Sequence, residues 1–474
     1  MNTEPSVRAR PPGGDSHLRV GVIGAGPAGL ALARALLRRS PRISIALFDP
    51  ALADPMLRGR GTPYRPDPAQ PLLNAPLRYM SVDPDDPGHC TTWFRSDPRA
   101  QGDPTFGSLT RPDFGVYLQA FLDDLSSCAT DRQSLTVHPV EVTAIRRSGA
   151  AHVFLSPRCE LGNFDVAVLC TGWGAVTPAT AADGTVHRGI RDVLGRTEVI
   201  IHGTGLTAVD HARALLSTAP GTRLVLTSRR GLLPGVRSLP LPGQDCTSSS
   251  PTPDEDRLRT VRGLAEHVLT EVRRRGLDLD PVTEELAAGP DATIRLEADL
   301  AHVDVPSWRN LAVPVSEDLL PRAWNLWARP QKRLFLRRFH PHVQSWCNPM
   351  PPSTAELLLD AMHTGRLVVR ADASSLPSLI PPGAIDATRS GCQSLAPLDV
   401  PLIRCLELGG LATRDPFGGV LTTERHRIVG RRGGAPLYAL GALTQGAHYV
   451  VNALDAVVRQ AARVADDISR LSRA

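Results

Sequence analysis

Three glycines at the spacing Gly24-x-Gly26-x-x-Gly29 could hold a phosphate group against the protein backbone. The first glycine permits a tight turn, the second lets backbone amides approach a pyrophosphate, and the third lets a helix pack closely on a strand. An apolar, β-rich stretch at 18–23 precedes these glycines, and a helix-forming run at 30–37 follows them. The positive end of that helix would face the phosphates. The pattern therefore predicts a pyrophosphate site between a strand and a helix.

An acidic residue stands where a ribose would need one. The next apolar stretch, 43–48, ends at Asp49, which lies 20 residues beyond Gly29. A carboxylate at this position can accept hydrogen bonds from ribose hydroxyl groups. The order of strand, glycine loop, helix, strand and acid is typical of a dinucleotide-binding βαβ unit.

A second unit of the same kind begins at residue 198. The apolar residues 199–202 lead into Gly203-Thr-Gly-Leu-Thr-Ala208, a variant in which alanine replaces the third glycine. A helix is expected over 209–217 and a strand over 223–227. This second pattern predicts a second dinucleotide-binding unit.

The second unit lacks the acid of the first and has arginines in its place. Arg229 lies 21 residues beyond Ala208, and Arg230 follows it. An arginine there can pair with a 2′-phosphate, which favours NADPH over NADH. The alternative interpretation is that both side chains are merely solvated.

Two such units in one chain predict an α/β fold with two Rossmann-like domains, one for FAD and one for NADPH, between which hydride passes. An apolar strand at 165–170 ends in Thr171-Gly172, where the chain would pass close to FAD and enter the inserted second domain. A strand at 436–441 and an amphipathic helix at 452–470 would close the first domain. The turn at Gly441 and the N-terminus of that helix would face the flavin and stabilise negative charge on it.

The sequence therefore predicts a discontinuous organisation. After a loose leader at 1–17, the FAD-binding domain comprises 18–180 and 385–474, the NADPH-binding domain 190–250, and a helical insertion with its return segment 251–384. Within the insertion, helices are expected at 257–275 and 281–288, and four of the six tryptophans fall between residues 304 and 365. For each tryptophan, a place in the core is the favoured interpretation.

Composition excludes several other classes of protein. The chain has 474 residues, of which 42% are hydrophobic and 21% charged, and no window holds 18 uninterrupted apolar residues. All but one of its 53 basic residues are arginine, and they are dispersed, so no nucleic-acid or membrane partner is expected. The eight cysteines form neither C-x-x-C nor C-x4-C and show no zinc spacing, which argues against a dithiol reductase or a metal site. Scattered thiols and no export signal predict a cytoplasmic protein.

Further motifs run through most of the chain. They are Gly59-Arg-Gly-Thr-Pro-Tyr64, Leu72-Leu-Asn-Ala-Pro76 with Met80-Ser81, Arg111 with Phe114-Gly-Val-Tyr117, the second glycine loop to Asp210, Ser228-Arg-Arg-Gly-Leu-Leu-Pro234, Met350-Pro-Pro352 and Leu437–Gly446. With these motifs the chain resembles the FAD/NAD(P)-binding proteins grouped with bacterial FAD-dependent urate hydroxylase and the aspartate N-hydroxylating, nitrosuccinate-forming monooxygenases.

This resemblance implies an FAD- and NADPH-dependent single-component monooxygenase that uses O2 to hydroxylate a small polar or aromatic metabolite through a flavin hydroperoxide. The residues expected to bind the cofactors, from the two glycine loops and from the resemblance, are Gly24, Gly26, Pro27, Ala28, Gly29, Asp49, Tyr64, Asn74, Met80, Arg111, Thr171, Gly172, Gly203, Gly205, Leu206, Thr207, Arg229, Arg230 and Gly441.

Two segments depart from the family. Before Met350, relatives carry a basic run of the form H-R-H-R, whereas residues 346–349 here read Trp-Cys-Asn-Pro, and residues 385–388 read Ile-Asp-Ala-Thr where relatives read closer to V-N-C-T-G. If the basic run meets an anionic substrate, this protein prefers a less acidic one; if it is structural, nothing changes. We expect a substrate pocket between the FAD domain and the insertion, with the contact residues Trp346, Asn348, His448 and Tyr449.

No acid–base pair is evident, and none is required, because a flavin monooxygenase mainly has to hold its cofactors, exclude water and orient the substrate. His340, His342 and His448 are candidates for substrate contact because they are expected in loops, whereas His202 is expected to be a strand residue. Asn74 and Gln445 could hydrogen-bond flavin or substrate. Two alternatives remain open at this point: an NADPH-dependent flavin reductase or dehydrogenase without oxygenation, and a flavin-binding scaffold without turnover.

Overall fold

The computed structural model describes residues 17–67, 71–96, 109–172, 190–237, 254–278, 286, 291–305, 315–372, 380, 383–388, 400–451 and 453–471. It divides into two compact units: the first contains Met1–Thr177 and Leu395–Ala474, and the second contains Pro178–Ser394. The expected leader at 1–17 and the expected helix at 281–288 lie outside the described residues, apart from His17 and Leu286.

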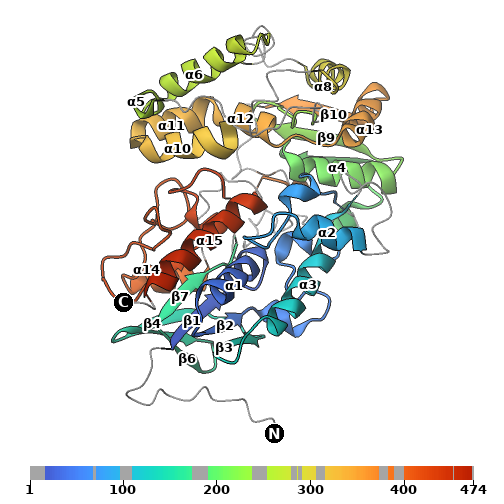
Figure 1. Cartoon of the computed structure of the whole chain (residues 1–474). Coiled ribbons are helices and arrows are strands. Elements are labelled where there is room, and N and C mark those ends of the chain that lie inside the picture. Colours follow the sequence, from blue (N-terminus) through green and yellow to red (C-terminus); the bar gives the residue numbers. More distant parts are fainter. Residues whose placement is uncertain are drawn as a thin grey trace. The chain divides into compact units, whose positions relative to one another are not determined.

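A five-stranded parallel sheet forms the centre of the first unit (Figure 1). Its strand order is β12-β7-β1-β2-β3, and each neighbouring pair is parallel. The strands are β1 (Leu18–Ile23), β2 (Ile43–Phe48), β3 (Gln133–His138), β7 (Val166–Leu169) and β12 (Leu437–Ala439). β1 lies between β2 and β7, and its last four residues are fully buried because both faces of the sheet are covered.

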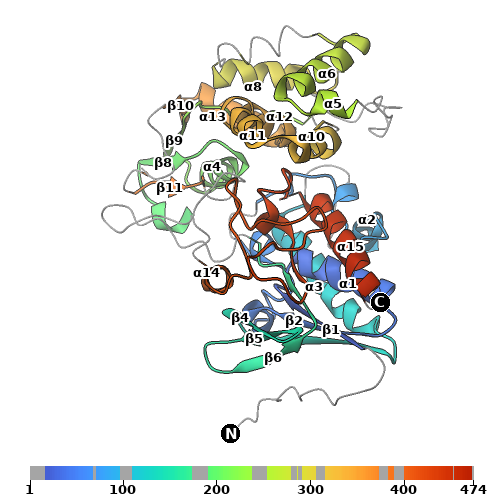
Figure 2. The ribbon, with the colours of Figure 1, turned by 90° about the vertical axis from the view of Figure 1, so that its left-hand side faces the viewer.

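Helices cover one face of this sheet and a second, antiparallel sheet covers the other (Figure 2). The helical face is packed by α1 (Pro27–Arg39), α2 (His89–Ser96), α3 (Arg111–Ser127) and α15 (Leu454–Leu471). The opposite face contacts α14 (Pro401–Leu408) and a three-stranded sheet of β4 (Ala144–Ser148), β5 (Ala151–Leu155) and β6 (Glu160–Phe164). Phe154 packs so closely over β1 that a Cβ on Gly21 would lie 2.5 Å from its ring. This antiparallel sheet was not predicted from the sequence.

The second unit is built on a four-stranded parallel sheet with the order β10-β9-β8-β11. Its strands are β8 (Glu198–His202), β9 (Arg223–Ser228), β10 (Leu367–Ala371) and β11 (Ile385–Asp386). Helices α4 (Leu206–Thr218), α8 (Ala292–Ala301) and α13 (Pro352–His363) pack on it. Because β11 pairs with β8, residues 385–388 belong to the second unit, and the expected return to the first domain at residue 385 is corrected accordingly.

The remaining helices of the second unit fall within residues 251–384, where a helical insertion was expected. They are α5 (Glu255–Leu258), α6 (Val261–Arg274), α10 (Leu320–Leu326), α11 (Arg329–Arg338) and α12 (His340–Cys347). The single helix expected over 257–275 is divided, since Thr260 caps a new helix at Val261. Trp324 and Trp327 are buried against each other and against Phe335, so they are core residues. Trp308 lies outside the described residues.

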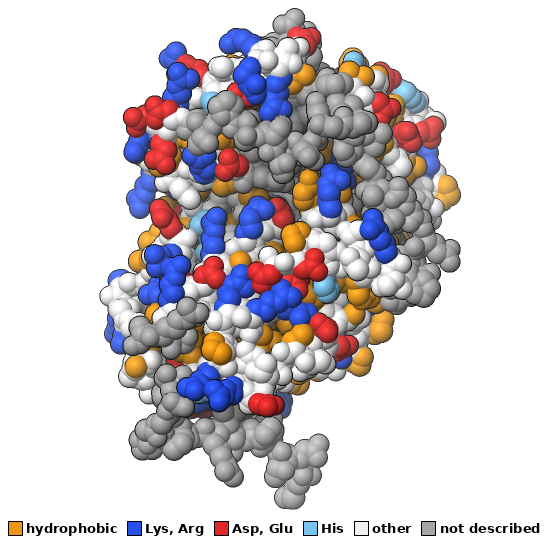
Figure 3. Space-filling model, viewed as in Figure 1, with side chains coloured by type: hydrophobic (Ala, Val, Ile, Leu, Met, Phe, Trp, Pro, Cys, Tyr) orange, Lys and Arg blue, Asp and Glu red, His pale blue; other side chains and the backbone are white. Residues whose placement is uncertain are grey.

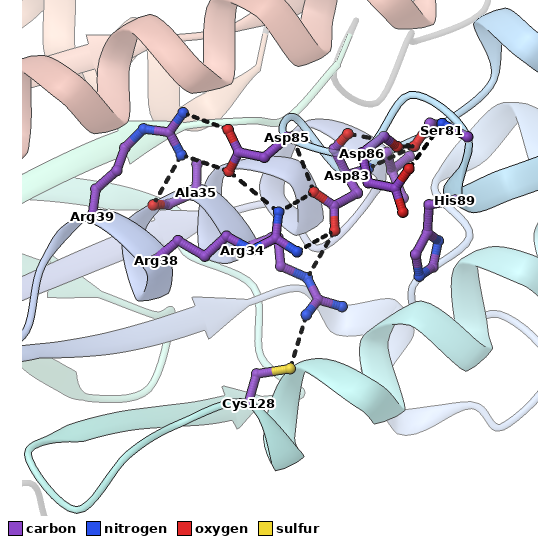
Figure 4. Close-up of polar contacts among 12 residues, drawn as sticks. Arg34, Ala35, Arg38, Arg39, Ser81, Asp83, Asp85, Asp86, His89 and Cys128 are labelled. Atoms are coloured by element: carbon purple, nitrogen blue, oxygen red, sulfur yellow. Dashed lines mark hydrogen bonds and ion pairs between the residues drawn. The ribbon is translucent and has the colours of Figure 1, made fainter.

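An acidic loop after Met80 is bound to the polar side of α1 (Figure 4). The Arg38 guanidinium donates to Asp83 at 2.8 Å, and that of Arg39 donates to Asp85 at 2.9 Å. Asp83 is 2% exposed, so its ionic contacts are shielded from water. These contacts fix the segment that carries Met80, one of the residues expected to bind a cofactor.

A buried carboxylate attaches the C-terminal helix to β12. Asp467 on α15 accepts hydrogen bonds from the Tyr438 hydroxyl at 2.7 Å and from Arg427 Nε at 2.9 Å. Burial of Asp467 opposes its ionisation, but the hydrogen bonds from Tyr438 and Arg427 outweigh burial and lower the pKa of the carboxyl below its ordinary value. The ionised form therefore stabilises the packing of α15.

This arrangement predicts a loss of stability at low pH. Because the pKa of Asp467 is lower in the folded state, its contribution is complete above the unfolded value of about 3.9 and disappears as the pH falls through the folded value. We expect Asp467→Asn to cost about 1–3 kcal/mol at pH 7 and progressively less below about pH 4. Thermal unfolding of both proteins across this range measures the difference. Asp455→Asn, which removes a more exposed pair with Arg459 on the same helix, is the control and should cost less than about 0.5 kcal/mol.

Acidic and basic side chains intermingle over much of the face in Figure 3, as expected from their dispersal in the sequence. Among the described residues, no helix is long and apolar enough to cross a membrane. No disulfide joins the six cysteines in the described part of the chain.

Candidate functional site

The first sheet brings the expected FAD residues to one edge. The glycine loop follows β1, Asp49 follows β2, Thr171 and Gly172 follow β7, and Gly441 is two residues beyond the end of β12. All four strands are parallel, so their carboxyl ends meet at the same edge. Ligands of open α/β sheets bind at this edge. Residues as far apart as Gly24 and Gly441 are therefore placed for one common site.

Two glycines of the first loop are required by close backbone contacts. Gly24 has a φ of 104°, and a Cβ there would lie 2.3 Å from the carbonyl oxygen of Cys170. A Cβ on Gly29 would lie 2.1 Å from the carbonyl oxygen of Gly24. Burial raises the pKa of the Cys170 thiol, which keeps it neutral beside the loop. The tight turn and the close packing of helix on strand are thus both present, as the sequence predicted.

The N-terminus of α1 has the properties of a phosphate site. Gly26 is its N-cap residue and provides no side-chain cap, with Pro27 and Ala28 in the first turn. In contrast, Thr110 caps α3 and Thr260 caps α6 through their hydroxyl groups. The first amides of α1 can therefore donate to a pyrophosphate, which fits FAD or another dinucleotide.

Asp49 both supports this loop and retains acceptor capacity. One carboxylate oxygen accepts from the backbone N–H of Ala25 at 3.0 Å, and the other accepts from that of Ala51 at 2.9 Å. A carboxylate has about four acceptor positions, so ribose hydroxyls can still bind. The side chain therefore stiffens the glycine loop in addition to its expected role.

A loop at 59–64 packs against the first glycine loop. A Cβ on Gly26 would lie 3.2 Å from the Cα of Gly61, whose own φ is 65°. Tyr64, at the end of this loop, packs edge-on against Phe114 with ring centroids 4.7 Å apart. The pKa of the Tyr64 hydroxyl is raised, mainly because the side chain is buried, while the charge of the nearby Arg111 opposes this rise.

The other residues taken from the resemblance lie on neighbouring segments. Leu72 forms an isolated bridge with Thr110, and Leu73 N–H donates to the Leu109 carbonyl at 2.9 Å, which holds Asn74 beside the start of α3. Asn74 is half-buried, whereas Met80 is 4% exposed. The structure therefore brings the segments of Tyr64, Asn74 and Arg111 together, and their contacts with a cofactor remain a prediction.

Gly441 makes a turn that α15 supports. Its φ is 65°, and its N–H donates to Oε1 of Gln460 at 2.8 Å. Gln460 is 5% exposed and also donates to Thr444 at 3.5 Å. Gln460 was not predicted as a site residue, since a single glutamine within an amphipathic helix has no distinguishing pattern.

The second glycine loop repeats this geometry in the second unit. Gly203 has a φ of 126°, and a Cβ there would lie 3.1 Å from the backbone of Ala387, which follows β11. Gly205 is the N-cap of α4, provides no side-chain cap, and has no atom within 4 Å of a Cβ position. Leu206 and Thr207 form the first turn of α4. The loop therefore has open space above Gly205, as a pyrophosphate requires.

Thr204 fixes this loop to the segment after β9. Its hydroxyl donates to the carbonyl oxygen of Leu232 at 2.6 Å and lies 2.9 Å from Oγ of Ser228. No role for Thr204 was predicted from the sequence. Its hydrogen bonds hold the loop that carries Arg229 and Arg230 beside the second glycine loop.

The two arginines of this loop differ in their contacts. Arg230 donates to the carbonyl oxygens of Arg337 and Arg338 and to the His342 ring. Arg229 is exposed, and among the described residues no hydrogen bond or ion pair holds its guanidinium. Arg229 therefore has the freedom to pair with a 2′-phosphate, while Arg230 is engaged with the protein.

We expect Arg229→Ala to weaken NADPH binding by about tenfold to a hundredfold, because a charge-assisted phosphate contact contributes about 1.5–3 kcal/mol. The Michaelis constants for NADPH and NADH, measured side by side, test this. The NADH value should stay nearly unchanged, since NADH lacks the 2′-phosphate. An equal increase for both nucleotides contradicts the assignment. Arg223→Ala, which removes an exposed arginine from the start of β9, is the control.

The histidines are placed differently from the expectation. His202 is the last residue of β8 and is 2% exposed, in agreement with its expected role in a strand. His340 and His342, however, lie on α12 and not in loops, and both are buried. Burial, together with the charge of Arg229, lowers the pKa of His340 to about 3, so this ring is neutral.

The four expected substrate residues fall into two pairs. Trp346 and Asn348 belong to the second unit, where Trp346 packs on His342 and Val272, and Asn348 donates to the Gln344 carbonyl at the end of α12. His448 and Tyr449 belong to the first unit. Their joint contact with a substrate stays a prediction.

His448 has a buried neighbour that the sequence analysis missed. The ring of His426 lies 4.3 Å from that of His448, is completely buried, and has a backbone φ of 62°. Burial, followed by the charges of His448 and Arg463, lowers the pKa of His426 to about 3. A neutral ring therefore packs against His448. No signal in the sequence marks residue 426, since the contact arises only from folding.

Comparison with known proteins gives the class of this fold. Residues 21–174 match the family described as FAD-NAD(P)-binding. The ornithine N-hydroxylase of Kutzneria sp. 744, solved with reduced FAD, NADP+ and L-ornithine, is 15% identical, with a TM-score of 0.52 over 96% of this chain and 99% of that one. The reduced form of the ornithine hydroxylase from Pseudomonas aeruginosa has the same identity, coverage and TM-score. No curated protein sequence matches the chain significantly.

The chain therefore has the α/β fold of flavoproteins with two dinucleotide-binding domains, which confirms the predicted fold class. The residues that match the FAD-NAD(P)-binding family lie in its first unit, which contains the first glycine loop.

Proposed function

We propose that this protein is an FAD-dependent, NADPH-using oxidoreductase and, more specifically, a single-component flavin monooxygenase. The observation that carries the proposal is the presence of two glycine loops, each at the carboxyl edge of its own parallel sheet and each opening a helix without a side-chain cap. The family match over residues 21–174 supports FAD as a cofactor of the first unit. Each sheet has one glycine loop, and each loop would hold one of the two cofactors.

The chain's own residues would bind and orient these cofactors. The first amides of α1 would hold the pyrophosphate of FAD, with Asp49 on the ribose and the Gly441 turn beside the flavin. The first amides of α4 would hold the pyrophosphate of NADPH, with Arg229 on its 2′-phosphate. When bound, FAD accepts a hydride from NADPH and activates O2.

The finer assignment follows the resemblance to FAD-dependent urate hydroxylase and the aspartate N-hydroxylating monooxygenases. We infer a small polar or aromatic substrate, a cytoplasmic location and contacts through Trp346, Asn348, His448 and Tyr449. Trp346, Cys347 and Asn348 stand where those relatives carry basic residues, so a neutral or aromatic amine or ring is favoured over a dicarboxylate.

One assay separates this function from its alternatives. NADPH oxidation, oxygen uptake and hydrogen peroxide are measured together across a panel of purines, amino acids and biosynthetic intermediates. A monooxygenase couples NADPH and O2 consumption to product, with little peroxide, when the correct substrate is present. NADPH oxidation only with an added acceptor identifies a reductase, and no NADPH oxidation at all identifies a scaffold; either result contradicts the proposal.

The preference against acidic substrates is testable with the same assay. We expect the double variant Trp346→His/Cys347→Arg to lower turnover of the native substrate by about tenfold, because the new charges are desolvated beside an uncharged ligand. Oxygen uptake coupled to product formation measures this, and unchanged flavin content shows that the fold is kept. Aspartate proving the best substrate of the unmodified protein contradicts the preference and leaves the cofactor assignments intact.

A further inference from the structure

The loop after β9 is joined to the turn between α11 and α12 by one side chain. The Arg230 guanidinium donates to the carbonyl oxygen of Arg337 at 3.0 Å and to that of Arg338 at 3.3 Å. It also donates to Nε2 of His342 at 2.8 Å. These contacts place the C-terminal end of α11 directly beside the loop that carries Arg229.

Arg230 also changes the electrostatics of this end of α11. The last carbonyl groups of a helix carry partial negative charge and would repel an anion. Two of these carbonyls, those of Arg337 and Arg338, accept from Arg230 instead. The contact therefore converts a helix C-terminus into a surface that an anion can approach.

Positive charge without acidic partners is concentrated where the loop after β9 meets the C-terminal end of α11. Arg229, Arg337 and Arg338 are exposed, and no acidic side chain pairs with them in the part of the chain that the structure describes. Elsewhere arginines pair with acids, as Arg38 does with Asp83 and Arg223 with Glu198. Arg229 is close enough to act on Arg230, whose pKa is lowered mainly by burial and further by the Arg229 charge.

We propose that Arg229, Arg337 and Arg338 form a phosphomonoester site, which takes the 2′-phosphate of NADPH. Arg337 and Arg338 are then specificity-determining residues that the helical insertion contributes, and Arg230 is a positioning residue. The inference rests on the proposed function, since it names the residues by which NADPH is selected over NADH. A phosphomonoester carries about −1.5 to −2 charges at pH 7, so one exposed arginine neutralises it only in part and several do so more fully.

The test uses binding and not turnover. The probes are 2′,5′-ADP and 5′-AMP, which differ only in the 2′-phosphate, and their affinities for the full-length protein are measured by calorimetry. We expect the unmodified protein to bind 2′,5′-ADP at least tenfold more tightly. Arg337→Ala/Arg338→Ala should reduce that preference by about three- to tenfold and leave 5′-AMP binding unchanged. Arg337→Ala and Arg338→Ala, each made alone, then show which side chain contributes more to the preference for 2′,5′-ADP, because successive residues point about 100° apart around a helix.

Arg329→Ala is the matched control. It removes an exposed arginine from the same helix, about 12 Å along the axis from Arg337, which exceeds the Debye length of about 10 Å at 0.1 M salt. It should leave the preference unchanged. Arg230→Ala should lower the ratio of the two affinities, and Arg230→Lys should restore part of it, whereas a merely structural defect would weaken both probes alike.

Two outcomes would overturn the inference and have different consequences. If the preference for 2′,5′-ADP persists in Arg337→Ala/Arg338→Ala, or falls equally in Arg329→Ala, these arginines form no specific site and the NADPH assignment stands. If the unmodified protein shows no preference for 2′,5′-ADP, the phosphomonoester site is wrong altogether. Flavin content and reduction by NADH then test the rest of the proposed function separately.

Discussion

The Gly26→Val protein is expected to purify without flavin. Gly26 begins α1, and the first amides of this helix have no side-chain acceptor, so they are available to a pyrophosphate. A valine there would extend into the space that the phosphates need. Because a Cβ at residue 26 would lie 3.2 Å from Cα of Gly61, the valine would also press on the 59–64 loop. We expect FAD content, measured from the visible absorbance, to fall by at least tenfold.

The control must separate lost binding from lost folding. Circular dichroism of the apoprotein shows whether the variant folds, and Gly26→Ala, with only one added carbon, should lose less flavin. Arg229→Ala, which alters only the second unit, should retain its flavin. A folded Gly26→Val protein with full flavin content would show that FAD is not bound at this loop.

The Gly205→Val protein is expected to keep FAD and lose NADPH. No atom lies within 4 Å of a Cβ position on Gly205, and its φ of −78° and ψ of −175° suit a β-branched residue. The valine Cβ therefore contacts no protein atom, and the side chain obstructs only the ligand. We expect the dissociation constant for NADPH to rise by about a hundredfold, as the loss of about 3 kcal/mol of phosphate contacts implies.

Stability should hardly change in this variant, since replacing glycine at an N-cap costs at most about 1 kcal/mol. Gly221→Val, an exposed turn residue of the same unit with nothing within 4 Å of its Cβ position, is the control and should bind NADPH normally. The measurement of NADPH binding is the rate of flavin reduction, recorded by stopped-flow spectroscopy as a function of NADPH concentration. If Gly205→Val reduces its flavin with an unchanged dependence on NADPH concentration, the second loop does not hold the nucleotide.

The helices and strands around both glycine loops were predictable because their signals are local. Apolar runs, the glycine spacing and Asp49 each depend on residues close in the chain, and β1, β2, β8 and β9 appear where these patterns put them. The sheet β4–β6 was missed because its strands are short and because Phe154 and Phe164 contact the main sheet only in the folded chain.

The boundary at residue 385 was wrong for a related reason. The two-residue strand β11 has no periodicity from which to assign it, and its pairing with β8 depends on a partner more than 180 residues away. His340 and His342 were expected in loops but lie on α12, whose first turn contains Pro341, a position at which proline is well tolerated in a helix.

Sequence alone determined the fold class and the two glycine loops, because glycine geometry acts through the nearest residues. It also placed two arginines after β9, whose preference for NADPH stays a prediction. Tertiary structure decided which of these side chains remain available. It engages Arg230 with the end of α11 and leaves Arg229 exposed, it packs His426 on His448, and it supports Gly441 through Gln460. Each of these contacts joins segments that are distant in sequence, and burial or a hydrogen bond between such segments follows only from the packing of the whole chain.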